Sequence, residues 1–383
     1  MKHSYIAKRF QSSGAGLSLD TEALAKYKDI IDLSIGDTDF TTDESIINAA
    51  FRDARAGHTH YGDPKGDPEL IDAVCRAWEE DFGQRLPRDH VLVSASSCLG
   101  MALVMLAILD PGDEVIVFSP YFPMYREQIE LAGGVCVDVP TYASEDYAID
   151  EARLRAAITP RTKAIVFNNP TNPTGMGYDG KTLELLARVA QEHDLLIAAD
   201  EIYTTYLYEG DFCPIRTLPG MAERTITLNS FSKNFLMTGW RVGVIIAEPE
   251  LLAVMNRING SLIYSAPSVS QRAAIQALAM RKEIREKYVT AYRDRIFYAA
   301  DRIEKLPYLS LVRPKGTFYL FPGVEKTGLD EKAFCKVLLD QAHVLVSPGT
   351  PFGVSAAGHF RIACTVGIDQ LKAAFDRMEK LSF

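Results

Sequence analysis

The chain has 383 residues, of which 47% are hydrophobic and 24% are charged, with a net charge of −9. This length accommodates two domains, and cores of that size need neither disulfides nor a structural metal. The acidic balance disfavours a nucleic-acid surface, and no apolar run is long enough to span a membrane. The six cysteines lack paired zinc spacing and the first ten residues lack an apolar signal segment, so we expect a cytoplasmic protein with reduced thiols.

Short apolar runs alternate with helical patterns through the middle of the chain. Strands are predicted at residues 91–94, 114–118, 163–167, 195–199, 225–228 and 242–247, and helices at 99–109, 125–132 and 182–193. Alternating βαβ units form a mostly parallel sheet that helices cover on both faces. The pattern therefore predicts a large α/β domain.

The C-terminal part follows a different pattern. A long helical pattern covers residues 281–305, and further helices are predicted at 331–340 and 369–379. Short elements are predicted at 309–313, 317–321, 344–347 and 359–363. We therefore predict a large domain over residues 46–283, a smaller α+β domain over 284–383, and an N-terminal segment, 1–45, that packs with the smaller domain.

Four polar clusters follow predicted strands, at residues 94–97, 168–175, 200–203 and 229–233. In open α/β sheets ligands bind outside the carboxyl ends of the strands. The four clusters therefore indicate one shared site.

Lys233 and Asp200 are the candidate chemical groups of this site. A partly desolvated lysine has a lowered pKa and attacks an aldehyde to form an imine. A buried carboxylate keeps a heteroaromatic nitrogen protonated, which makes the ring a better electron sink. Read alone, Lys233 is more typical of a solvated surface lysine, and Asp200 is equally typical of a helix cap or a strand-end carboxylate.

A second group of side chains has the chemistry of an anion site. Ser96 and Ser97 begin a helix after a strand, where backbone N–H groups favour a phosphate. Ser230, Ser232 and Arg241 supply further donors, and an arginine makes a two-pronged charged contact. Simple helix capping would also explain the serines, and a surface ion pair would explain Arg241.

Five more side chains complete the candidate site. Asn172 and Tyr203 have donors for a phenolic oxygen, and Phe122 has a flat face for ring stacking. Arg361, on a predicted strand, is suited to a substrate carboxylate. Tyr61 lies in a loop rich in Gly and Pro. Core or loop packing and strand-face ion pairs are the ordinary alternatives for these residue types.

Taken together, these strings resemble the class I and II aminotransferases of fold type I, which use pyridoxal 5'-phosphate (PLP). The resemblance extends from residues 32–36 to Arg361 and includes the string at 169–175, Asn-Pro-Thr-Asn-Pro-Thr-Gly. It implies a seven-stranded type of sheet in the large domain. One departure concerns the phosphate loop, because relatives often begin it with Gly and have Gln, Glu or Lys near the positions of Ser97 and Cys98.

The resemblance also implies a role for each residue. Lys233 would carry the cofactor as a Schiff base, Asp200 would pair with the ring nitrogen, and Asn172 and Tyr203 would contact the phenolic oxygen. Phe122 would stack on the ring. The phosphate would be bound by Ser96, Ser97, Ser230, Ser232 and Arg241.

For the substrate, Arg361 resembles the arginine that binds the α-carboxylate, and Gly36 the loop glycine near the substrate. Tyr61 resembles the tyrosine that reaches the phosphate from a second subunit, so a homodimer is implied. The expected reaction is a ping-pong transfer of an amino group from an L-amino acid to a 2-oxo acid such as 2-oxoglutarate. Without a second arginine for a distal carboxylate, neutral or aromatic amino acids are favoured.

Side-chain selectivity is expected to depend on residues 38–40, on His58 and His60, and on the neighbouring subunit. Three alternatives stay open at this point. The same scaffold carries out carbon–sulfur β-elimination, which Lys233 and Asp200 do not distinguish from transamination. A PLP-sensing regulator is disfavoured because the pattern begins by about Asp32 and leaves no room for a DNA-binding module. A cofactor-free homologue is disfavoured because Lys233, Asp200 and Arg241 are all present.

Overall fold

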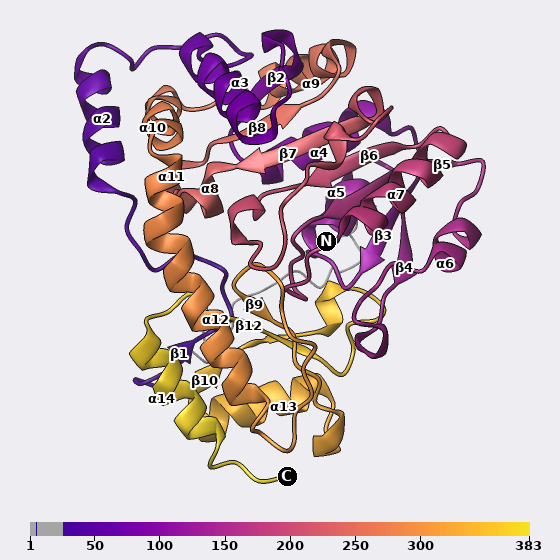
Figure 1. Ribbon diagram of the computed structural model, residues 1–383, viewed down its shortest axis with the longest axis vertical. Helices are drawn as coiled ribbons and strands as arrows, with labels where there is room; N and C mark the ends of the chain where they lie inside the picture. The colour runs from indigo at the N-terminus through magenta and orange to yellow at the C-terminus, as the bar shows by residue number, and fades with distance from the viewer. Residues whose placement is uncertain (1–4, 6–25) are drawn as a thin grey trace.

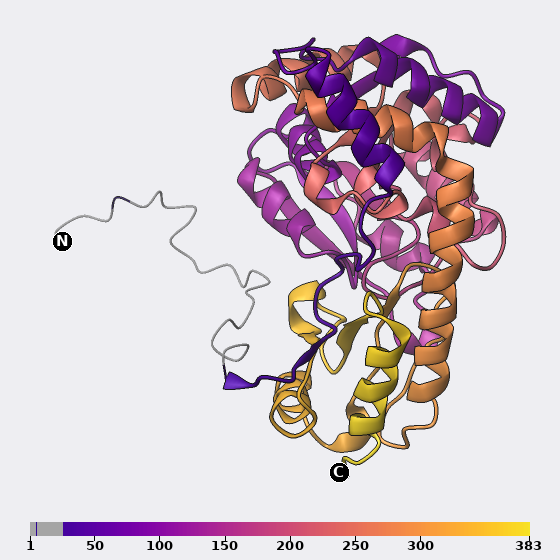
Figure 2. The same ribbon diagram turned by 90° about the vertical axis from the view of Figure 1, so that its left-hand side faces the viewer.

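The computed structural model describes Tyr5 and residues 26–383. Most of the segment predicted to pack with the smaller domain, residues 1–4 and 6–25, lies outside the described residues. The predicted boundaries after residues 45 and 283 stay predictions. Figures 1 and 2 show a large upper part around a sheet and a smaller lower part that contains the C-terminus.

The large part is organised around a seven-stranded sheet with the order β2-β8-β7-β6-β5-β3-β4. Only β8 runs against its neighbours, β2 and β7, and the other pairs are parallel. The α/β fold class and the mostly parallel sheet are therefore confirmed. The strands are β2 (Val91–Ser94), β3 (Glu114–Ser119), β4 (Val135–Pro140), β5 (Thr162–Asn168), β6 (Leu196–Asp200), β7 (Thr225–Ser230) and β8 (Gly243–Ile246).

Helices cover both faces of this sheet, because its central strands are apolar on both sides. Val115 and Val117 of β3 belong to one core cluster, and the intervening Ile116 belongs to another. The first cluster includes side chains from α4 (Ser97–Ile108), α5 (Met124–Leu131) and α9 (Pro249–Leu262). The second includes side chains from α6 (Glu151–Ala156) and α7 (Gly180–Glu192).

Three helices that the strand pattern did not predict pack at the β2 end of the sheet. They are α2 (Glu44–Arg55), α3 (Pro68–Phe82) and α10 (Ser268–Ala279), and α10 contacts both of the others. Aspartates cap α2 and α3, Asp43 and Asp67, and each accepts a backbone N–H two residues later. β4 was not predicted either; it is an edge strand whose side chains are mostly half-exposed.

The predicted long helix is present as one continuous helical run that links the two parts (Figures 1 and 2). It consists of α11 (Arg281–Ile284), a π-helical turn at Arg285–Val289, and α12 (Thr290–Ile303). It leads into a three-stranded antiparallel sheet of β11 (Ser347–Pro348), β12 (Phe360–Ala363) and β9 (Tyr319–Leu320). The helices α13 (Glu331–Val337) and α14 (Ile368–Met378) pack with it.

The chain's N-terminal side also reaches this smaller part. β1 (Ile31–Asp32) pairs in parallel with β10 (Val344–Leu345), so the strand before Gly36 lies beside the C-terminal region. The prediction of an element at residues 309–313 is wrong, because only Ser310 forms an isolated bridge, with Gly323. Within the described part of the chain, no helix combines the length and apolarity that a membrane crossing needs.

Candidate active site

Lys233 lies in α8 (Phe231–Asn234), the short helix that directly follows β7. Its Nζ donates a hydrogen bond to the carbonyl of Gly36. Burial lowers the pKa of the amine to about 8, although the carboxylate of Asp37 opposes this and favours the ammonium. A lysine with this pKa has a sizeable neutral, nucleophilic fraction near neutral pH, unlike a solvated surface lysine.

Asp200 ends β6, and its two carboxylate oxygens differ in environment. Oδ2 accepts a hydrogen bond of 2.5 Å from the hydroxyl of Tyr125, whereas Oδ1 is buried and has no partner. Burial raises the pKa of the carboxyl to about 6, and the Tyr125 hydroxyl and the backbone N–H of Ile202 partly counteract this. A buried carboxylate oxygen without a partner is costly unless a cation pairs with it. A protonated ring nitrogen fits that requirement, and a helix cap does not.

Arg361 projects from β12 into the same region. Its guanidinium donates to Oδ1 of Asn172 at 3.0 Å and to the carbonyl of Ser34 at 2.6 Å, while its Nε is buried without a partner. No acidic side chain of the described residues pairs with it, so the strand-face ion pair is excluded. A buried cation with spare donors is suited to a bidentate carboxylate contact.

Ser96, at the start of α4, and Ser230, at the end of β7, cap helices and can also donate hydrogen bonds to a ligand. Ser96 caps α4 by accepting the N–H of Leu99 at 3.1 Å, and Ser230 accepts the N–H of Ser232 at 3.1 Å. Capping therefore does account for these two serines. It occupies lone pairs only, however, so each hydroxyl proton remains available to a ligand.

Close backbone approach shapes this end of the site. A Cβ at Gly243 would lie 2.8 Å from the backbone nitrogen of Ser97, so β8 passes directly under the start of α4. Arg241 precedes it with φ of 53° and donates to the carbonyl of Thr238 at 2.7 Å. It has no carboxylate partner among the described residues, and it lines the same cleft as Ser96 and Ser97 at the start of α4. This arrangement suits a phosphate.

These groups line one cleft of about 1260 Å³. All the predicted site residues except Tyr61 line it: Gly36, Ser96, Ser97, Phe122, Asn172, Asp200, Tyr203, Ser230, Ser232, Lys233, Arg241 and Arg361. Tyr125, Asp37 and Tyr319 also line it and were missed, because nothing in the spacing of the sequence distinguishes them from core or loop residues.

Residues predicted to set side-chain selectivity are not in this lining. Asp39 accepts hydrogen bonds from Arg295 at 2.7 Å and from Tyr292 at 2.9 Å, and Phe40 lies under the Arg295 guanidinium. They tie the segment after Gly36 to α12. Within this chain, residues 38–40, His58 and His60 therefore do not contact the cleft.

Tyr61 is separate from the cleft and 87% exposed. Its ring packs against Tyr264, with centroids 5.0 Å apart. Both ends of its loop are anchored to the start of α10. Ser268 donates to the carbonyl of His58 at 3.1 Å, and the side chain of Gln271 accepts the N–H of Asp67 at 2.6 Å.

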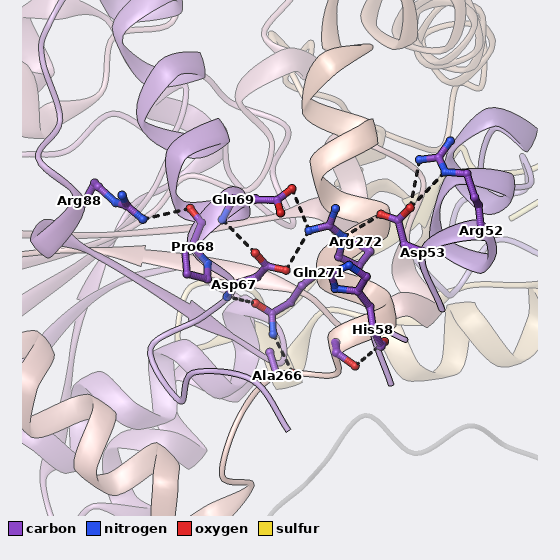
Figure 3. Close-up of polar contacts among 11 residues, drawn as sticks. Arg52, Asp53, His58, Asp67, Pro68, Glu69, Arg88, Ala266, Gln271 and Arg272 are labelled. Atoms are coloured by element: carbon purple, nitrogen blue, oxygen red, sulfur yellow. Dashed lines mark hydrogen bonds and ion pairs between the residues drawn. The ribbon is translucent and has the colours of Figure 1, made fainter. Parts of the chain in front are cut away.

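Arg272 strengthens this anchor with charge (Figure 3). Its guanidinium lies 2.7 Å from Asp53, 3.2 Å from Asp67 and 3.0 Å from Glu69, and its side chain is only 11% exposed. The loop is thus held at both ends while the tyrosine between them points outward.

Known proteins provide an independent comparison. The model of the family "Aminotransferase class I and II" matches residues 28–378. The chain belongs to the class I and II aminotransferases. An aspartate/prephenate aminotransferase of Thermus thermophilus is 38% identical over 98% of each chain, and an arginine–pyruvate transaminase of Pseudomonas aeruginosa is 35% identical over 99% of this chain and 97% of its own.

Solved structures agree with this assignment. A Thermus thermophilus aspartate aminotransferase double mutant superimposes with a TM-score of 0.93 at 35% identity, covering 99% of this chain and 100% of that one. An aromatic aminotransferase of Pyrococcus horikoshii gives 0.90 at 34% identity over 94% and 97%. The aminotransferase is therefore a PLP-dependent transaminase of fold type I. The expected family, enzyme class and cofactor are confirmed.

Proposed function

We propose that Lys233 and Asp200 hold the reactive part of the cofactor, with Lys233 bonding to its aldehyde carbon and Asp200 pairing with its ring nitrogen. The observation that carries this proposal is the pairing, in one cleft, of a lysine whose pKa is about 8 with a buried carboxylate oxygen that lacks a partner. PLP supplies an electron sink for the bond broken at the substrate Cα. Asn172 and Tyr203 are assigned to its phenolic oxygen and Phe122 to its ring face.

The phosphate belongs, in this proposal, at the start of α4. Ser96, Ser97, Ser230 and Ser232 supply hydroxyl or backbone donors and Arg241 the charge. The anchored and exposed loop of Tyr61 supports a contribution from a second subunit. The functional unit is then a homodimer in which each Tyr61 completes the partner's phosphate site.

Lys233 also acts as the proton carrier. A general base works best when its pKa is near the working pH, and an amine with a pKa of about 8 takes a proton and returns it at little cost. The carbonyl of Gly36 accepts a hydrogen bond from its amine, and the negative charge of Asp37 favours the protonated form.

Arg361 is assigned to the α-carboxylate, with Asn172 and Gly36 beside it. Arg241 and Arg361 are the only arginines that line the cleft among the described residues, so no arginine among them is left for a distal carboxylate; Lys26, Lys332 and Lys336 also line it. Apolar side chains, including Ile35, Phe122 and Val346, line it as well. We infer a neutral or aromatic amino acid as donor and a 2-oxo acid such as 2-oxoglutarate as acceptor, exchanged in a ping-pong cycle.

Replacing Lys233 by Ala tests the core of this proposal. The variant should lose both the visible absorbance of the cofactor-loaded protein and its turnover, whereas Lys372→Ala, on the surface of α14, should lose neither. Survival of the visible band and of turnover in Lys233→Ala would refute the assignment.

A panel of single amino acids, each added without an acceptor, tests the donor and the reaction. A ping-pong transaminase converts its cofactor to a stable amine form and releases one equivalent of 2-oxo acid. Continuous release of pyruvate and ammonia from cysteine conjugates would indicate a β-lyase instead. Aspartate reacting faster than neutral and aromatic donors would contradict the assigned preference.

A further inference from the structure

Tyr319, on β9, connects the two halves of the active site. Its hydroxyl lies 3.1 Å from the hydroxyl of Tyr203, and its ring centre lies 4.7 Å from the guanidinium carbon of Arg361. It is buried, and β9 holds it in register opposite Ala363 of β12. A Cβ at Gly36 would lie 1.7 Å from the Tyr319 hydroxyl oxygen, so the glycine makes room for this hydroxyl.

The number of protons in this hydroxyl pair determines which tyrosine donates. Each hydroxyl has one proton to donate, and the other tyrosine is its only hydrogen-bond partner within the described residues. Burial raises the pKa of both tyrosines, so both stay protonated at neutral pH. If Tyr203 gives its proton to the phenolic oxygen of the cofactor, it can only accept from Tyr319.

We propose that Tyr319 is a positioning residue that donates to Tyr203 and thereby directs the proton of Tyr203 toward the cofactor, while its ring supports Arg361. This inference rests on the proposed contact of Tyr203 with the cofactor. Tyr319 touches the cofactor-facing hydroxyl with one end and the substrate-binding guanidinium with its face. One side chain thus aligns both, through a hydrogen bond on one side and a cation–π contact on the other.

Tyr319→Phe removes the hydroxyl and keeps the ring. Without its donor, Tyr203 gives a weaker hydrogen bond, and the phenolic oxygen keeps more negative charge. That charge favours the protonated, visible-absorbing form of the resting protein. The midpoint of a pH titration of this absorbance, recorded without substrate, should therefore move up by about half a unit or more, equivalent to about 0.7 kcal/mol.

The hydrogen bonds from Tyr319 to Tyr203 and from Tyr203 to the cofactor form a relay. Tyr203→Phe should move the midpoint further in the same direction. Adding Tyr319→Phe to it should have no additional effect, because Tyr319 then has no Tyr203 hydroxyl to donate to. A midpoint that moves in Tyr203→Phe but not in Tyr319→Phe overturns the relay and leaves the proposed function intact. A midpoint unmoved by Tyr203→Phe overturns the assigned contact of Tyr203, and the relay with it.

Comparison of Tyr319→Leu with Tyr319→Phe tests the second role. Phe preserves the ring under Arg361, so KM for the amino donor should stay within about twofold, whereas Leu should raise it about fivefold or more. Equal KM values in the two variants would refute the support of Arg361. Tyr308→Phe is the matched control: it loses a buried hydrogen bond of 2.6 Å to the carbonyl of Met378, outside the cleft, and should change neither the midpoint nor KM.

Discussion

Asp200 should make the cofactor-free protein less stable as the pH rises. Its folded-state pKa is about 6, above the ordinary value of 3.8, because burial disfavours the carboxylate. Between these values the folded chain binds a proton that the unfolded chain has lost. The associated stability is therefore complete below about pH 3.8 and lost as the pH rises through 6. At 1.36 kcal/mol per pKa unit the whole loss is about 3 kcal/mol, of which about 2 kcal/mol falls between pH 4.5 and 7.5.

Asp200→Asn removes this titration and keeps an acceptor for Tyr125. Urea unfolding of the cofactor-free proteins at pH 4.5 and 7.5 measures the effect. The wild type should lose about 2 kcal/mol more than the variant on going to the higher pH. Any cost of burying the amide is the same at both values and cancels. Glu201, whose pKa burial raises to about 8, titrates in both proteins, and the charge of Asp200, which also raises this pKa, adds to the loss in the wild type alone.

Asp369→Asn is the control for net charge, because its carboxylate is 95% exposed. Its free energy of unfolding should change between the two pH values as that of the wild type does. Identical pH dependence in Asp200→Asn and the wild type would refute the argument that the carboxylate is destabilised in the empty cleft. Saturating PLP should reduce the pH-dependent loss of stability in the wild type alone, since a pyridinium would then pair with the charged oxygen of Asp200.

Three further variants test other parts of the site. Arg361→Lys replaces a two-pronged contact worth about 1.5–3 kcal/mol, so KM for the amino donor should rise about 10- to 100-fold in steady-state kinetics, and an unchanged KM would contradict its role. Arg272→Met leaves the partly buried carboxylates of Asp53 and Asp67, 15% and 19% exposed, without their cation and should lower the free energy of unfolding by about 2 kcal/mol with faster loss of cofactor. Arg281→Met, whose partners Glu80 and Asp81 are 57% and 41% exposed, should cost less than about 1 kcal/mol. Equal losses from the two arginines would argue against the anchor. Gly243→Ala pushes on the start of α4 and should weaken PLP binding about tenfold or more in a fluorescence titration, and unchanged binding would show that the loop yields.

The sequence by itself determined the fold class and most of the cleft. Apolar runs of strand length between helical patterns reflect strands buried on both faces, which is a local property of the chain. Polar residues after those strands converge because strands that run in one direction end at the same edge of the sheet. Lys233, Asp200, Asn172 and the serines were found for that reason.

Only the tertiary structure decided which polar groups lack hydrogen-bond partners and which side chains contact one another. The environment of Asp200 depends on Tyr125 of α5, and the depressed pKa of Lys233 depends on burial and on Asp37, Arg361 and Arg241 from other parts of the chain. Tyr319 and Tyr125 resemble core aromatics in the sequence, because the groups that their hydroxyls contact, the Tyr203 hydroxyl and the Asp200 carboxylate, belong to residues 75 or more positions away. The hydrogen bonds of Arg272 that anchor the Tyr61 loop likewise join segments about 200 residues apart. Such contacts produce no periodic pattern in the sequence.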